Sequence, residues 1–169
     1  LTSPKADART LRRIANALFH LRTPLQNTES LLAQILNSDR VDFSVLDEIA
    51  YGLGKWKNPE INGERLLEKI LNSDKSDEAV LETIARAIGK SKSPLTNGEK
   101  MLAQIMNSKK ATAYTLGSVA SAIGDSEHSL ANGEKMLQEI LNSNKASAPT
   151  LERIVDAIEK SKHPLVNGE

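Results

Sequence analysis

The sequence predicts an all-α protein, a right-handed α-solenoid of stacked two-helix repeats. The dipeptide Asn-Ser recurs every 35 residues without an insertion or a deletion. Apolar residues inside each unit twice follow the i, i+3, i+4 spacing of a helix face. A single hairpin cannot bury two such faces, whereas neighbouring hairpins that stack on one another can. An irregular helical globule is the alternative, but it gives no reason for a constant register.

The repeat register divides the chain into a single array. The Asn-Ser pairs begin at Asn37, Asn72, Asn107 and Asn142. The same step links the leucines Leu11, Leu46, Leu81, Leu116 and Leu151. The units are about 1–36, 37–71, 72–106 and 107–141, with an incomplete unit at 142–169. Natural arrays end in atypical capping units, so we expect this array to be a fragment of a longer one.

The first helix of each unit has recognisable ends. A side-chain oxygen four residues before each leucine predicts an N-cap, at Asp7, Asp42, Asp77, Thr112 and Ser147. A glycine near the other end predicts termination in the left-handed conformation, at Gly54, Gly89 and Gly124. Between these signals, Leu46, Ile49 and Leu53 represent the buried stripe.

The second helix of each unit begins at a repeated asparagine. In the third unit we expect the Asn97 side chain to cap the helix and Glu99 to face the positive end of its dipole. Met101, Leu102 and Ile105 then form a wide apolar face. Each second helix is expected to end at the asparagine of Asn-Ser, in the left-handed conformation.

Composition excludes several classes of protein. The chain has 169 residues, 22 basic and 22 acidic residues and no cysteine. No disulfide scaffold, thiolate metal site or cysteine nucleophile is therefore possible. No apolar run approaches the ~20 residues that span a bilayer, so we expect a soluble protein without a membrane partner. The lack of cysteine is compatible with a reducing compartment, but the sequence does not specify one.

The residue patterns predict no enzyme. His20, His128 and His163 fall in separate loops without the neighbours that a metal site needs. The repeated glutamate, as at Glu99, is explained by its place in the first turn of a helix. Asn-Gly-Glu lacks the preceding strand and the second glycine of a phosphate loop. We therefore predict no catalytic, metal-binding or cofactor-binding residue and no small-molecule substrate.

The loop after each first helix is the most variable stretch, and variable exposed positions are where binding differences arise. Three units carry Lys-x-Lys there, and the fourth carries Asp-x-Glu instead. Stacking would align these charges along one edge, extended by basic residues in the first turns of the second helices. The candidate partner-binding residues are Arg22, Tyr51, Lys55, Trp56, Lys57, Arg65, Lys90, Lys92, Lys100, Asp125, Glu127, Lys135, Lys160 and Lys162.

Two aromatic residues stand at positions that are mostly polar in the other units. Trp56 lies in the variable loop, and Tyr51 lies on an exposed position of the preceding helix. Together they suggest a hot spot for a protein partner or a platform for stacking bases. The alternative is that Trp56 folds back onto the neighbouring loops.

The charge balance favours a protein or peptide as the partner. Nucleic-acid-binding domains commonly have a pI above about 9, whereas this chain has a pI near 7.1. Nucleic-acid binding through the Lys/Arg edge is the alternative, and the same charges also suit an edge that is only solvated. A purely structural spacer is a third interpretation.

Short stretches resemble known helical-hairpin repeats. Ala-Ile-Gly-Lys-Ser-Lys-Ser-Pro at 87–94 resembles octotricopeptide-type RNA-binding repeats and the repeats of some bacterial plant-pathogen effectors. Asn-Gly-Glu-Lys-Met-Leu-x-x-Ile at 132–140 is similar to the start of the second helix in transcription-activator-like effector repeats. The 35-residue period matches pentatricopeptide repeats, although their glycine and alanine positions do not fit. The resemblance implies stacked hairpins, while the different loop and unit lengths allow no base-reading residue to be carried over.

Overall fold

A computed structural model describes residues 6–21, 25–56, 63–92 and 94–162. Their regular structure consists of nine α-helices without a strand, so the all-α prediction is confirmed. The first helices of the units are α1 (Ala8–Phe19), α3 (Phe43–Lys55), α5 (Glu78–Gly89), α7 (Ala113–Asp125) and α9 (Ala148–Lys160). The second helices are α2 (Thr28–Leu36), α4 (Gly63–Leu71), α6 (Gly98–Met106) and α8 (Gly133–Leu141).

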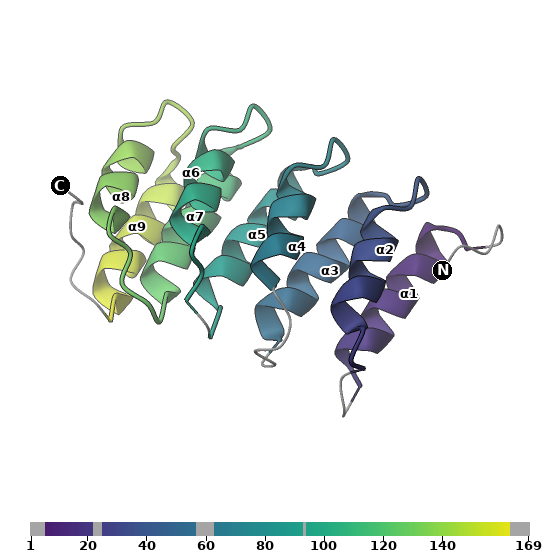
Figure 1. Cartoon of the computed structure of the whole chain (residues 1–169). Helices are drawn as coiled ribbons and strands as arrows, with labels where there is room; N and C mark the ends of the chain where they lie inside the picture. The colour runs from purple at the N-terminus through teal and green to yellow at the C-terminus, as the bar shows by residue number, and fades with distance from the viewer. Residues whose placement is uncertain (1–5, 22–24, 57–62, 93, 163–169) are drawn as a thin grey trace.

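The helices follow one another in a row of hairpins from α1 to α9 (Figure 1). Each odd-numbered helix packs on the next odd-numbered one, and the even-numbered helices form the second layer. Loops that lead from one hairpin to the next lie along one edge, and the described parts of the loops inside the hairpins lie along the other edge (Figure 1).

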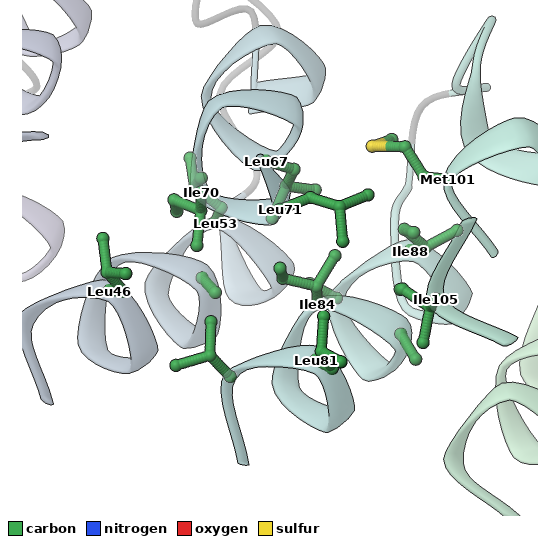
Figure 2. Close-up of a cluster of buried hydrophobic side chains, with 14 of the residues drawn as sticks. Leu46, Leu53, Leu67, Ile70, Leu71, Leu81, Ile84, Ile88, Met101 and Ile105 are labelled. Atoms are coloured by element: carbon green, nitrogen blue, oxygen red, sulfur yellow. The ribbon is translucent and has the colours of Figure 1, made fainter. Parts of the chain in front are cut away.

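One continuous apolar core fills the space between the two layers. Figure 2 shows side chains of α3, α4, α5 and α6 meeting there, among them Leu46, Ile70 and Ile84. Leu102 and Ile105 of α6 are fully buried, as the apolar spacing predicts. The helical faces read from the sequence are therefore the faces that form this core.

The predicted N-caps of the first helices occupy the cap positions of all five. The Asp7 carboxylate, for example, accepts a hydrogen bond of 2.8 Å from the amide of Thr10. This hydrogen bond from the Thr10 backbone is the main reason that the pKa of Asp7 lies below its ordinary value. These capping bonds satisfy backbone amides that would otherwise lack a helical partner.

The second helices begin differently from the prediction. Asn97 stands at the N-cap position of α6, but its side chain makes no capping hydrogen bond. Its φ of −107° and ψ of 13° differ from the extended backbone that a capping side chain usually requires. The Glu64 carboxylate of the preceding unit accepts a hydrogen bond from the Asn97 amide instead. Glu99 repeats this arrangement one unit later, toward the Ala131 amide and the Asn132 side chain.

The glycines near the ends of the first helices are not left-handed caps. No glycine among the described residues has a positive φ, and both α3 and α7 continue one residue beyond their glycine. Their role is close helix packing. A β-carbon on Gly89 would lie 2.6 Å from Cα of Ala122, and one on Gly124 would lie 2.5 Å from Cα of Ala157. Gly54 meets Ala87 in the same way.

The asparagines of Asn-Ser also keep the right-handed conformation, against expectation. Asn37, Asn107 and Asn142 end their helices with φ between −87° and −85°. The side chain of Asn107 donates a hydrogen bond of 2.9 Å to the carbonyl of Ala103. This bond satisfies a terminal carbonyl group without a left-handed residue.

Candidate functional site

A groove of about 700 Å³ runs along the ends of α3, α5, α7 and α9. It lies on the edge of the loops inside the hairpins, where the sequence predicts the binding surface. Its lining consists of Gly54, Lys55, Trp56, Gly89, Lys90, Lys92, Gly124, Asp125, Glu127, Lys160 and Lys162. The structure thus brings together most of the predicted binding residues from four units.

The charges of the groove form two rows in the repeat register. The helix-end row is Lys55, Lys90, Asp125 and Lys160, at or just after the last residues of α3, α5, α7 and α9. The loop row, two residues further along each unit, is Lys92, Glu127 and Lys162. A glycine precedes the helix-end row in three of the four units, so the groove floor there carries no side chains.

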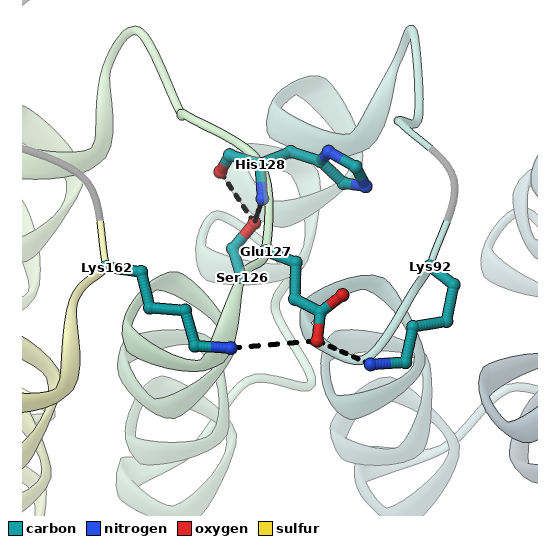
Figure 3. A network of polar contacts seen from close by, with 5 residues as sticks. All are labelled: Lys92, Ser126, Glu127, His128 and Lys162. Carbon is teal, nitrogen blue, oxygen red and sulfur yellow. Dashed lines mark hydrogen bonds and ion pairs between the residues drawn. The ribbon is translucent and has the colours of Figure 1, made fainter.

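Glu127 joins the lysines of the loop row. It forms an ion pair with Lys92 from the preceding unit and a second one, at 3.6 Å, with Lys162 from the following unit (Figure 3). The hydrogen bond from Lys92, with the positive charges of both lysines, holds the pKa of Glu127 below its ordinary value. The acidic residue that breaks the Lys-x-Lys pattern therefore bridges three units.

The helix-end row contains no such bridge within the described residues. The ammonium of Lys55 lies 4.1 Å from the centre of the Tyr51 ring, and Lys160 pairs with Asp156 at 3.2 Å on its own helix. Asp125 is exposed and makes no ion pair within the described part of the chain. Exposed pairs within one helix are weak, so these lysines remain accessible to a partner.

The two aromatic residues differ in their surroundings. Trp56 is half-buried, and its ring packs edge-on against Phe19 at a centroid distance of 5.1 Å. Its indole nitrogen is buried and has no hydrogen-bond partner among the residues that the structure describes. Tyr51, by contrast, is 52% exposed, as expected from its polar register position. Trp56 is thus part of the groove wall and packs on the first unit, whereas the Tyr51 ring is exposed beside the Lys55 ammonium.

Some predicted residues lie elsewhere. Arg65 lines a different groove, between α2 and α4. Lys100 and Lys135 are exposed in the first turns of α6 and α8 and do not line the groove of the helix ends. Arg22 and Lys57 lie outside the described residues.

A second basic series escaped the sequence analysis. It occupies the opposite edge, three residues after each Asn-Ser asparagine, at Arg40, Lys75, Lys110 and Lys145. Each side chain donates to a backbone carbonyl of the preceding unit, as Lys75 does to Asp39 at 2.9 Å. A positive charge recurs at this position every 35 residues, and this regularity could have revealed the series in the sequence. The contacts show that these basic side chains link neighbouring units.

The described residues hold no group of three or more His, Asp or Glu side chains able to bind a metal ion. None of their helices combines the length and hydrophobicity needed to cross a membrane. No protein-family model matches the chain, and neither does any curated protein. The resemblance to particular hairpin repeats therefore gains no support from a family match, and the repeat type stays unassigned.

Proposed function

We propose that the chain is a right-handed α-solenoid, one array of the five units given by the repeat, and a non-catalytic scaffold for a protein or peptide. The groove along the helix ends is the proposed binding surface. Its support is that the lining comes from four successive units and carries charges of both signs. Surfaces with mixed charge discriminate between partners through the matching charges of those partners.

The position of Glu127 carries the choice of a protein over a nucleic acid. It pairs with Lys92 and Lys162, and Lys160 pairs with Asp156, so three of the five groove lysines already have an anionic partner. A phosphate backbone would have to pass this carboxylate and Asp125 in the middle of the groove. Repulsion at that point disfavours a continuous polyanion, whereas a polypeptide can place a basic side chain there.

Selection of binders from a random peptide library, followed by affinity measurements, tests this proposal. The variant Lys90→Glu with Lys160→Glu reverses two charges of the helix-end row, and we expect it to lose affinity about tenfold or more. Arg12→Glu with Lys109→Glu is the matched control, because it changes net charge equally at exposed sites outside the groove. Equal affinity of the two double variants would contradict the assignment of the groove.

Nucleic-acid binding remains the second candidate, supported by the excess of lysines over carboxylates in the groove. A gel shift with random DNA and RNA at low salt separates the two functions. A nucleic-acid ligand would lose affinity steeply between about 50 and 200 mM salt, in proportion to the phosphates contacted. We expect no stable shift for the wild-type chain.

A further inference from the structure

We propose that the groove binds an extended peptide segment whose charged residues recur at every third position, in the order acidic, acidic, basic, acidic. This inference rests on the proposed function and specifies its partner. The pattern is the complement of the helix-end row, which reads Lys55, Lys90, Asp125, Lys160 along the array. All four side chains are exposed and line the same groove.

The spacing follows from helix packing. Neighbouring packed helices lie about 8–10 Å apart, and the first helices pack on one another in sequence. Glycine–alanine contacts between successive first helices make the distance from one helix to the next regular. A polyproline II segment rises about 3.1 Å per residue with three residues per turn, so every third side chain points the same way at steps of about 9 Å. One turn of such a peptide therefore matches one unit of the array.

Asp125 gives the row its selectivity. Lysines at helix C-termini are favoured by the helix dipole, which accounts for Lys55, Lys90 and Lys160 without any ligand. An aspartate at the C-terminus of α7 opposes the dipole. It also has no ion-pair partner among the described residues, in contrast to Glu127 of the loop row. The sign of Asp125 thus has no structural explanation, and a basic residue of a partner supplies one.

The loop row limits where such a peptide binds. Glu127 pairs with both Lys92 and Lys162, so the charges of these three residues are partly offset within the protein. The helix-end row also lines the groove, and its contacts stay within single helices: Lys55 lies over the Tyr51 ring, and Lys160 pairs with Asp156. Gly89 and Gly124 add no side chains to the groove, and Ala122 and Ala157 of the following helices occupy the space that β-carbons there would take.

Four labelled synthetic peptides test the inference by fluorescence polarisation. The matched peptide is Glu-Pro-Pro-Glu-Pro-Pro-Lys-Pro-Pro-Glu, in which proline holds the polyproline II conformation. The second has the same composition with its charges at every second position. The third replaces lysine with glutamate, and the fourth places the lysine at the first charged position and glutamate at the other three, so that neither chain direction sets lysine opposite Asp125. We expect wild-type protein to bind the matched peptide about fivefold to tenfold more tightly than each of the others.

A charge swap in the protein makes the test specific to Asp125. Asp125→Lys should reverse the preference, so that the all-acidic third peptide binds more tightly than the matched one by a similar factor. Asp125→Asn should lower the preference without reversing it, which keeps the test open if the lysine variant folds poorly. Asp74→Lys, at an exposed site of the opposite edge, is the control and should leave the preference unchanged.

The outcomes separate this inference from the proposed function. Equal affinity for the two spacings, tighter wild-type binding of the all-acidic peptide, or an unchanged preference in Asp125→Lys would each overturn the inference. If library-selected peptides still lose affinity in Lys90→Glu with Lys160→Glu, the groove remains the binding surface and only the charge pattern is wrong. If that double variant binds them normally, the proposed function fails as well.

Discussion

Phe19 fills the space that a side chain on Gly52 would occupy, because a β-carbon there would lie 2.3 Å from Cδ2 of Phe19. The large and small residues are exchanged at the later junctions, where α3 packs on α5, α5 on α7 and α7 on α9. There a glycine stands at the repeat position of Phe19, and an alanine stands at the repeat position of Gly52. At each of these junctions the first helices therefore meet with at least one glycine. This exchange of sizes accounts for the unit whose Phe19 departs from the glycine pattern.

The glycine contacts predict an unusual cost for a small substitution. Alanine is ordinarily favoured over glycine inside a helix. In Gly89→Ala, however, the new methyl group would meet backbone atoms of Ala122, so we expect a loss of about 1–3 kcal/mol in the free energy of unfolding. Urea denaturation measures it. Gly63→Ala is the control, since the nearest described neighbour of a β-carbon there, Leu53, is 3.6 Å away; equal effects at both positions would contradict the packing role.

The first junction predicts a coupled pair. Gly52→Ala alone should destabilise the chain by about 1–3 kcal/mol through overlap with Phe19. Phe19→Gly combined with Gly52→Ala recreates the glycine–alanine pair of the later junctions. We expect a favourable coupling of about 0.5–3 kcal/mol in a double-mutant cycle followed by denaturant unfolding. Strictly additive effects would show that the two residues do not share the same space.

The core between the layers predicts a large loss on truncation. Ile105 is fully buried in α6, so Ile105→Ala should lower the free energy of unfolding by about 2–5 kcal/mol. Lys100→Ala, on the exposed side of the same helix, should change it by less than about 0.5 kcal/mol. Thermal and urea unfolding of both variants test which face of α6 is buried. A small change in the free energy of unfolding in Ile105→Ala would refute this assignment.

The bridge at Glu127 predicts a pH dependence. Its pKa is lowered in the folded state, so its contribution to stability is complete above the ordinary range for glutamate and is lost as the pH falls through the lowered value. Lys92→Met removes the main cause and should raise the Glu127 pKa, which an NMR titration of its carboxyl carbon measures. Lys109→Met is the control and should leave the Glu127 pKa unchanged. An unchanged Glu127 pKa in Lys92→Met would mean that the pair is absent in solution.

Local signals explain which parts of the structure the sequence could predict. The caps of the first helices, the apolar faces and the helical class depend on residues a few positions apart, where spacing fixes geometry. Predictions that depended on where a neighbouring helix lies were less successful. Gly89 and Asn107 looked like left-handed helix ends, because either residue tolerates that conformation, yet both keep a negative φ.

By itself, the sequence determined the 35-residue period, the order of the helices and the order of charges in the two rows, since these are properties of spacing along one chain. The tertiary structure alone decided that Gly89 meets Ala122, that Glu99 holds the start of the next second helix, and that Glu127 pairs with lysines of two neighbouring units. Each of these contacts joins residues more than 30 positions apart. The reason is that a periodic pattern specifies which face of a helix is buried, but only the packing of one helix against the next sets the distances between side chains.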